Sequence, residues 1–442
     1  MKALRYLLFS FIILSFNHLD AQFQISAELR PRFEANNGFN FTPAKTTETT
    51  FYVVQRSRLN LAFDHAKYGY FLSLQDARVW GDDNVASGTT ALFNNSSSGI
   101  HQAWMRIRLN DNSFLKIGRQ EFSYDDQRLL SARNWTTTGV TYDALLYHHQ
   151  NMGWTFDLGL SWNNDATKGT AAGTGTNTFT VDPISRRLRT LNFIYLKKEI
   201  KTNWYLSATG LLTGYQKDKT TSTIYLAGTY GIHSYFSNGN IDSRINLFGQ
   251  NGKNQKGKQL KAWMFTAEAD YKLKKFKAGA GIDLLSGHDA SNMDAGYLVA
   301  DHSFDLFYGM RYAKYGLMNQ YVVQSNTGNG GLIDIYPRIQ FLPDQSNKIS
   351  VDFHFFSLQQ SIKNPLQADQ YLSGSIGSEL DVVWTHSFSK ELNLHTGFGW
   401  YFTNETYASM REIETGSLGQ PYFGWVMLTF KPVLFKTEAT NK

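Results

Sequence analysis

Hydrophobic and polar residues alternate along most of the chain from residue 22 onward. In residues 23–34, Phe23 and Ile25 fall on one face of an extended chain, and Arg30 and Arg32 fall on the other. Successive side chains of a β-strand point to opposite faces, so this pattern predicts strands with one apolar and one polar face. Amphipathic strands of about ten residues are typical of outer-membrane barrels. The alternation recurs in residues 51–64, 263–271 and 349–355.

The connections between the predicted strands are short on one side and long on the other. This alternation implies about 18 antiparallel strands with both termini at the short-turn end. We therefore expect an all-β fold, a single antiparallel transmembrane β-barrel with short periplasmic turns and long extracellular loops. A large β-sandwich or a propeller is the soluble alternative, but these folds need no long loops at one end only, and the chain shows no blade repeat. Short turns are predicted at residues 65–67, 110–113, 150–153, 199–203, 237–240, 274–275, 343–347 and 388–391, and longer connections at 35–50, 81–98, 123–140, 163–187, 217–221, 251–260, 286–330, 360–375 and 403–419.

The composition agrees with a barrel and excludes several other classes. Aromatic residues make up 15% of the chain, and Pro numbers only 8, which suits strands and aromatic girdles at the membrane surfaces. The mean hydropathy of −0.36 is too polar for a bundle of membrane helices. Cysteine is absent, so the chain can form no disulfide, thiolate zinc site or cysteine nucleophile. A barrel of about 16–18 strands leaves an aqueous channel, which favours transport.

The first 21 residues have the features of a secretory signal peptide. Lys2 and Arg5 precede a largely apolar run at residues 7–16, and residues 19–21 offer a cleavage point before Gln22. The apolar run is half as long as the roughly 20 residues that a membrane-spanning helix requires. We therefore assign residues 1–21 to a signal peptide and residues 22–442 to a barrel in the bacterial outer membrane, in contact with its lipid.

Charged residues are distributed unevenly between the predicted polar faces, and the net charge is +6. Rings of Arg or Lys favour anions in pores, so we interpret the basic face as part of a solute pathway. Alternatively, Glu28, Glu34 and Asp64 neutralise these arginines across neighbouring strands. Charges that face a lumen form no exposed patch, so we expect no nucleic-acid partner. The basic set is Arg30, Arg32, Arg56, Arg58, Arg106, Arg108 and Lys116, and the acidic set on later strands is Glu268, Asp270, Asp283, Asp334, Asp352, Glu379 and Asp381.

The stretch of residues 286–330 is too long for a structureless loop tip. It contains His302, Tyr308, Arg311 and Tyr315, which would narrow the pore if part of the stretch folds inward. An extracellular cap is the other interpretation, and the residues alone do not decide between the two.

Residues 118–135 read GRQEFSYDDQRLLSARNW and are followed by Gly139 and a Tyr-Asp-Ala strand start at residues 142–144. Together with residues 75–81 and 101–104, this segment resembles the alginate-export family of outer-membrane barrels. The resemblance implies an 18-stranded channel for an anionic uronate polysaccharide, with arginines lining the conduit. Charges this dense on one loop can equally tie the loop to the barrel wall by salt bridges. The family residues that map here are Arg78, Arg119, Asp125, Asp126, Arg128 and Arg133, with Trp135 and Asp143 in the same motif.

We therefore expect a channel that passes an anionic, uronate-type poly- or oligosaccharide. A general porin that takes up small anions or sugar acids fits the mixed charges as well, and a surface adhesin is a third possibility. We expect no enzyme, no metal and no cofactor, because nucleotide-binding and zinc-protease motifs do not occur and the adjacent His148 and His149 point to opposite faces of a strand. Periplasmic export or catabolic partners would set the direction of transport.

Overall fold

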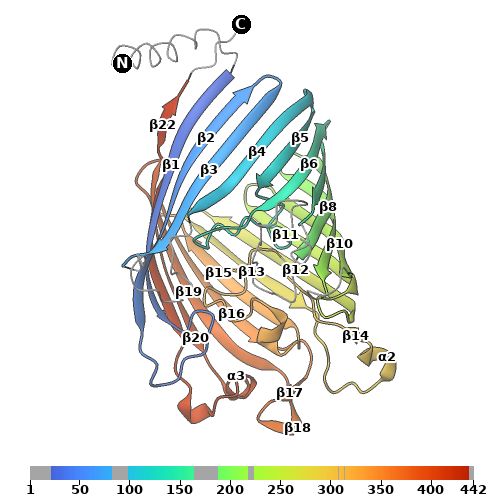
Figure 1. The fold of residues 1–442 in the computed structure, drawn as a ribbon. Coiled ribbons are helices and arrows are strands. Elements are labelled where there is room, and N and C mark those ends of the chain that lie inside the picture. Colours follow the sequence, from blue (N-terminus) through green and yellow to red (C-terminus); the bar gives the residue numbers. More distant parts are fainter. Residues whose placement is uncertain are drawn as a thin grey trace, which may run out of the picture.

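The computed structural model describes residues 21–81, 98–163, 188–217, 223–306, 308–312 and 314–437. Within these residues, 18 antiparallel strands form one barrel (Figure 1). They are β1 (Ala21–Asn37), β2 (Thr50–His65), β3 (Tyr68–Val79), β4 (Gly99–Asn110), β5 (Ser113–Gln120), β6 (Tyr142–Asn151), β7 (Trp154–Ser161), β8 (Leu188–Lys201), β9 (Trp204–Gln216), β10 (Ile224–Ser237), β11 (Ile241–Lys253), β12 (Gln259–Leu273), β13 (Phe276–Leu285), β15 (Leu332–Phe341), β16 (Asn347–Ser357), β19 (Ser375–Ser387), β20 (Leu392–Phe402) and β21 (Tyr422–Phe430).

The first and last strands close the barrel. β1 pairs with β2 on one side and with β21 on the other, so the sheet has no open edge whose backbone groups would lack partners in lipid. Pro432 interrupts the final strand because proline has no N–H to join the ladder. The chain then continues as β22 (Val433–Lys436), which pairs with the beginning of β1.

The predicted pattern of connections is confirmed for the described residues, whereas most of the predicted connections at 81–98, 163–187 and 217–221 lies outside them. β1 begins and β22 ends at the same end of the barrel as the short turns, and the long connections gather at the opposite end (Figure 1). The turn between β6 and β7 has positive φ at Met152 (49°) and Gly153 (74°), the backbone that matches the twist of a two-residue hairpin. The predicted signal peptide, apart from Ala21, lies outside the described residues.

The long connections carry the remaining small elements. They are α2 (Ala295–Leu298), β14 (Ala300–Asp301), the 3₁₀ turn η1 (Gln324–Thr327), the hairpin β17 (Ile362–Asn364) and β18 (Gln367–Leu372), α3 (Glu405–Met410) and the 3₁₀ turn η2 (Thr415–Ser417). No helix in the described ranges has the length and apolar character needed to cross a membrane.

The outer wall is apolar and has aromatic residues near both ends. Trp80 and Trp400 are exposed near the long loops, and Trp154 and Trp384 are exposed near the short turns, as expected for girdles at two membrane surfaces. The alternation predicted from the sequence places the following exposed side chains outward: Leu59, Ile107, Ile194, Ile232, Leu247, Ile339 and Val426.

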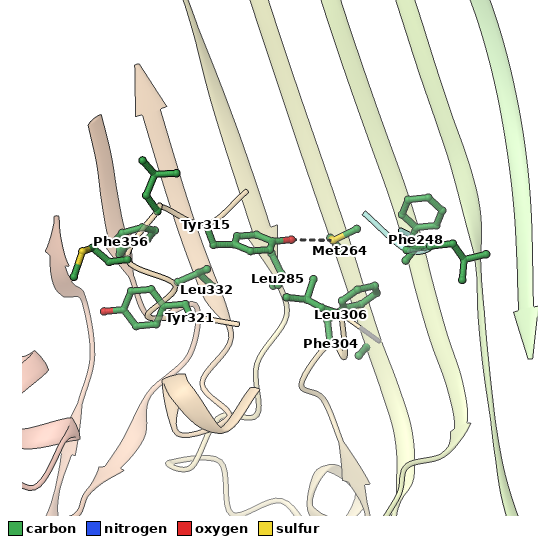
Figure 2. Close-up of a cluster of buried hydrophobic side chains, with 14 of the residues drawn as sticks. Phe248, Met264, Leu285, Phe304, Leu306, Tyr315, Tyr321, Leu332 and Phe356 are labelled. Carbon is green, nitrogen blue, oxygen red and sulfur yellow. Dashed lines mark hydrogen bonds between the residues drawn. The ribbon is translucent and has the colours of Figure 1, made fainter. Parts of the chain in front are cut away.

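A hydrophobic core lies inside the barrel, where two connections fold inward. Figure 2 shows Phe304 and Tyr315 of the connection between β13 and β15 packed against Met264 and Leu285, which belong to strands. The connection between β5 and β6 contributes Leu130, which is 2% exposed. Burying this apolar surface stabilises both connections inside the lumen, so the barrel is not an open tube.

Candidate solute pathway

Residues 121–141, the connection between β5 and β6, cross the inside of the barrel. Arg128 donates to Asp283 on β13 at 2.6 Å and to Asp126 of its own loop at 3.2 Å. Asp126 in turn accepts from Asn246 on β11 at 2.9 Å. Arg128 is 2% exposed, so these charge-assisted hydrogen bonds take the place of water.

The same loop is also bonded to the wall formed by β7, β8 and β9. Asp125 accepts from Tyr195 at 2.8 Å and from Ser207 at 2.7 Å. Tyr124 donates to Asp157 at 2.8 Å. Asp125 and Asp126 of the family motif therefore hold the loop against the barrel wall.

The far end of the loop lies against β1. Arg32 donates to the carbonyl oxygen of Trp135 at 2.7 Å, and its guanidinium lies 4.1 Å above the centre of the Trp135 ring. Arg30 donates to the carbonyl oxygens of Asn134 and Thr136. Backbone carbonyls of the loop thus occupy two guanidinium groups that would otherwise face the lumen.

The neighbouring strand β2 completes this contact. Arg56 is 1% exposed and donates to Glu28 at 2.9 Å. Arg58 donates to Gln75 at 2.8 Å and to the carbonyl oxygen of Thr138 at 3.2 Å. The structure therefore contains the pairing of Arg56 with Glu28 that we considered as an alternative to solute contact.

Three further basic residues lie toward the short-turn end of the lumen. Arg106 and Arg108 both bind Asp64, at 2.6 and 3.1 Å. Lys116 places its ammonium group 4.7 Å from the centre of the Trp104 ring. The two arginines thus share one carboxylate, and Lys116 lies against an aromatic ring.

Two arginines from the family motif lie on the outer face, contrary to our assignment to the lumen. Arg119 pairs directly with Ala103, whose face of β4 carries the exposed Met105 and Ile107, and residues opposite one another in an antiparallel pair share a face. Its guanidinium binds Asp143 at 2.9 Å.

Our assignment of Arg78 to the lumen is wrong in the same way. It lies on the face of β3 that carries the exposed Leu74, and it donates to Asp76 at 2.6 Å. Both arginines are near the long-loop ends of their strands, where outward charges meet water rather than lipid. Simple alternation cannot distinguish such residues from lumen residues.

The second inward segment belongs to the connection between β13 and β15. Ser131 donates its backbone N–H to the carbonyl oxygen of Tyr308 at 3.2 Å, and Met310 donates to that of Gln127 at 2.7 Å. A Cβ atom on Gly309 would lie 1.9 Å from the carbonyl oxygen of Arg128, so this close approach requires glycine. The two inward loops therefore form one unit.

Aromatic stacking also joins the two loops. The rings of Trp135 and Tyr312 are parallel within 3°, with their centres 3.8 Å apart. Arg133 donates to the carbonyl oxygen of Gly309 at 2.9 Å. Further along, Tyr308 shares a hydrogen bond of 2.7 Å with Tyr215 on β9.

Carboxylates of the acidic wall accept hydrogen bonds from backbone N–H groups of the second loop. Leu317 donates its N–H to Asp381 at 3.0 Å, and Met318 donates to Glu379 at 2.6 Å. Gly316 lies against the Glu379 carboxyl group, which a Cβ atom would meet at 2.5 Å.

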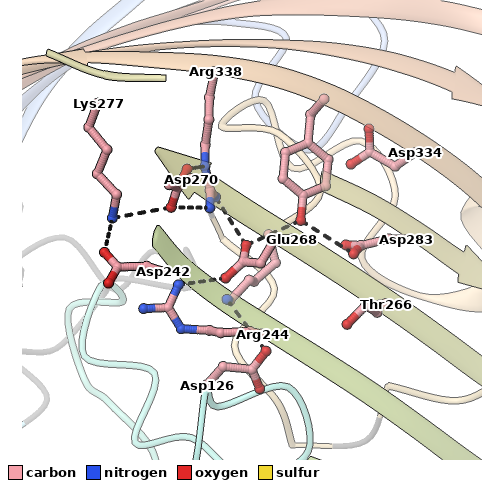
Figure 3. Close-up of polar contacts among 12 residues, drawn as sticks. Asp126, Asp242, Arg244, Thr266, Glu268, Asp270, Lys277, Asp283, Asp334 and Arg338 are labelled. Atoms are coloured by element: carbon pink, nitrogen blue, oxygen red, sulfur yellow. Dashed lines mark hydrogen bonds and ion pairs between the residues drawn. The ribbon is translucent and has the colours of Figure 1, made fainter. Parts of the chain in front are cut away.

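Basic side chains from neighbouring strands pair with Glu268, Asp270 and Asp334 of the acidic set. Figure 3 shows Arg338 between Asp270 and Glu268, and Arg244 beside Glu268. His354 contacts Asp334 at 2.8 Å. Part of the acidic wall that we predicted is therefore a network of ion pairs.

Of the residues that we expected to narrow the pore, His302 lies apart from the inward loops. It hydrogen-bonds the carbonyl oxygens of Lys261 and Tyr297 and stacks on the Tyr297 ring, with the ring centres 4.0 Å apart. Tyr315 is 1% exposed, and it accepts a hydrogen bond from Arg128 at 3.3 Å. Tyr315 is thus part of the contact between the loops and the wall.

Two cavities lie beside the docked loops. The first, which we call the loop cavity, measures about 490 Å³, and a second, about 330 Å³, lies toward β11 and β12. Arg311 lines both. The loop cavity is further lined by Arg32, Glu34, Arg133, Trp135, Tyr312 and Asn319, and the second cavity by Lys256, Asp301, Asp305 and Ser325.

The sequence model of the alginate export family matches residues 21–415. The chain belongs to this family. With its closed 18-stranded barrel, it is an outer-membrane channel protein of the alginate-export family. No curated protein matches the sequence significantly.

Solved porins of Pseudomonas aeruginosa have the same fold as this alginate-export family member. OccK5 (OpdH) superposes with a TM-score of 0.61 at 11% identity, covering 93% of this chain and 98% of that chain. OprD gives a TM-score of 0.59 at 10% identity, covering 93% and 96%. OccK11 (OpdR) gives 0.58 at 12% identity, covering 93% and 96%.

Tyr312 and Asn319 line the loop cavity but were not among our candidates. They lie on the irregular segment between β13 and β15, where no periodicity marks a side chain as facing inward. The mapped motif residues Arg133 and Trp135 do reach the cavity. Only the docking of the two loops brings these four side chains together.

Proposed function

We propose that this outer-membrane channel passes an anionic, uronate-type saccharide and catalyses no reaction. The observation that carries the proposal is the set of three arginines, Arg32, Arg133 and Arg311, around a cavity between the barrel wall and both inward loops. Among the described residues that line the cavity, Glu34 is the only acidic one, and it is already bonded to Arg32 at 2.6 Å and to Tyr52 at 2.7 Å. The cavity therefore has a positive balance that favours a carboxylate.

The size of the cavities favours small saccharides. Cavities of about 490 and 330 Å³ fall in the range of small-molecule sites, roughly 300–1,000 Å³. The hydrophobic core beneath the docked loops fills part of the lumen. Uptake of sugar acids or short oligosaccharides is thus the second candidate function.

Bilayer recording tests the proposal. Reconstituted in a planar bilayer under a salt gradient, the channel should show a reversal potential that indicates anion preference. Oligouronates should block the current at lower concentrations than neutral oligosaccharides of equal length. Absence of conductance would contradict the channel proposal, and equal block by both saccharides would leave a porin without uronate preference. A catabolic or export partner in the periplasm would give the passive channel its direction.

Arg133→Gln should shift the reversal potential toward the cation side, since it removes a positive charge from the cavity. Burial and, to a smaller extent, the neighbouring Arg311 lower the pKa of Arg133 to about 10, yet the group stays charged at neutral pH. The matched control is Arg119→Gln, which removes the same charge from the outer face. An equal shift in both variants would show that the cavity does not determine selectivity.

A further inference from the structure

The connection between β13 and β15 leaves the wall before it folds into the lumen. We call its residues 287–299, which include α2, the outer strap. β14 follows the strap and pairs with Gln259 and Leu260 of β12. Figure 1 shows α2 displaced sideways from the barrel wall, whereas β17 and β18 lie beyond the ends of the strands. The outer strap is therefore separate from the two docked loops.

The contacts of β14 place the outer strap on the outer face of the wall. Asp301 accepts from Asn254 at 2.8 Å and lines the second cavity beside the inward loops. The preceding residue, Ala300, points to the opposite face, because side chains alternate along a strand. Ala300 is nevertheless completely buried, and α2 contacts β14. The strap thus covers the outer face at this position.

The strap leaves the wall at the level of an aromatic girdle. Tyr230 and Trp263 flank Gly249 in one row across β10, β11 and β12, and both rings are exposed on the outer face. Ser286, the last residue before the strap, donates its backbone N–H to the carbonyl oxygen of Trp263 at 2.9 Å. Outward Tyr and Trp rings mark the boundary between membrane and water. The strap therefore begins at this boundary.

The strap also ends close to the girdle. β14 pairs with Gln259, which precedes Trp263 on β12 by four positions, about 13 Å along a strand at roughly 3.3 Å per residue. A strand tilt of about 35–45° reduces this to a height of about 10 Å. Interfacial segments bury their apolar side chains by about 5–10 Å at the boundary between headgroups and acyl chains. Apolar side chains of the strap are thus within reach of the lipid.

Three large apolar side chains of the strap are exposed. Met293 is 73% exposed and Val299 is 63% exposed, and Leu298 is exposed beside Val299. Met293 and Val299 are more exposed than Leu247 of the lipid-facing wall, at 51%. Contact of such side chains with water is unfavourable, and contact with lipid removes this cost.

The polar groups of the strap are used to hold its base. The rings of His288 and His302 stack on Tyr297, with their centres 5.1 and 4.0 Å from the centre of that ring. The Tyr297 hydroxyl accepts from the N–H of Asp289 at 2.7 Å, and Asp294 accepts from the N–H of Tyr297 at 2.9 Å. The base is thus fixed by stacking and hydrogen bonds, and the apolar side chains remain on the outside.

We propose that the outer strap is a lipid anchor, in which Met293, Leu298 and Val299 insert into the interfacial region of the outer leaflet. The position of the strap beside the girdle residue Trp263, on the outer face of the wall, favours lipid as the occupant. Lys261 is exposed on the same face of β12, two positions from Trp263, and provides a cation for headgroup phosphates. The inference concerns the attachment of the channel to its membrane and is independent of the solute.

Single cysteines test the anchor, because the chain has no cysteine of its own. Met293→Cys carries a nitroxide label, and the full channel is reconstituted in vesicles of phosphatidylethanolamine and phosphatidylglycerol. Electron paramagnetic resonance measures how often the label collides with oxygen, which concentrates in lipid, and with a nickel chelate, which stays in water. The matched controls are Leu247→Cys on the lipid-facing wall and Gln370→Cys on β18, since both native residues are exposed.

The label on Met293→Cys should collide more often with oxygen than with the nickel chelate, as on Leu247→Cys, and Gln370→Cys should show the opposite order. Val299→Cys should behave like Met293→Cys, and it provides the same test if one of the two variants does not fold. Frequent collisions with the nickel chelate at both positions would place the strap in water and overturn the inference. Rare collisions with both reagents would show that protein, such as a second copy of the channel, covers the strap, and would overturn it as well.

Discussion

Arg128 is the side chain whose removal should most directly release the loop of residues 121–141 from the barrel wall. Its guanidinium binds Asp283 at 2.6 Å and Asp126 at 3.2 Å, and it donates to the hydroxyl of Tyr315 at 3.3 Å. Asp283 is completely buried. Arg128→Met keeps the length of the side chain but leaves the Asp283 carboxylate without its cation.

Removing one partner of a buried ion pair costs about 3–5 kcal/mol, because the remaining charge has neither water nor a counter-ion. The β-ladders of the barrel do not involve this contact, so the loss acts on the equilibrium between docked and undocked loops. A change of this size shifts that equilibrium by about 10² to 10⁴-fold. We therefore expect a folded barrel in which the loop is frequently released into the lumen.

Single-channel recording should show a higher conductance and greater open-channel noise for Arg128→Met than for the unmodified protein. Asp283→Asn, combined with Arg128→Met, removes the unpaired charge and should restore most of the original conductance. The control is Arg244→Met, whose ion pair with Glu268 is partly exposed and contributes about 1 kcal/mol or less. Unchanged conductance in a folded Arg128→Met channel would refute the reasoning, and so would a double variant that behaves like the single one.

Substitutions at three further positions test other contacts of the two loops. Gly309→Ala should separate the loops, since the new Cβ would lie 1.9 Å from the Arg128 carbonyl oxygen, and its single-channel conductance should rise. Trp135→Leu removes stacking on Tyr312 worth about 0.5–1.5 kcal/mol beyond area burial and should increase open-channel noise, whereas Trp135→Phe should do so less. Arg30→Gln should lower anion preference and weaken the contact with residues 134–136, which limited proteolysis of the reconstituted channel can detect as faster cleavage.

The strands and their connections could be predicted because the information is local. Period-two alternation identifies a strand from its own residues, and short polar runs such as Lys274-Lys275 mark turns without reference to distant parts of the chain. An even number of strands places both termini at one end, which allows β1 to pair antiparallel with β21. These features did not require knowledge of any side-chain contact.

The inside of the barrel depends on contacts that local patterns do not contain. Arg128 and Asp283 are 155 positions apart in the sequence. A polar lumen permits many pairings of opposite charges, and the residues next to Arg128 and Asp283 in the sequence do not indicate this one. Local patterns also led us to assign Arg78 and Arg119 wrongly to the lumen, because a charged residue can face either the lumen or the water-facing end of the outer wall. For Tyr312 and Asn319, the sequence gives no periodic signal at all.

The contacts that the lumen arginines make explain why a polar wall alone does not form a selectivity filter. Alternation places Arg30, Arg32 and Arg56 inside the barrel, but the docked loop supplies carbonyl oxygens to all three, and Glu28 and Glu34 bind two of them. These groups consequently hold the loop in place. Charge combined with a cavity occurs where the two loops meet, at Arg133 and Arg311. Substitutions of the wall arginines should therefore alter selectivity mainly by moving the loops, whereas substitutions at the loop junction should alter it with the loops still docked.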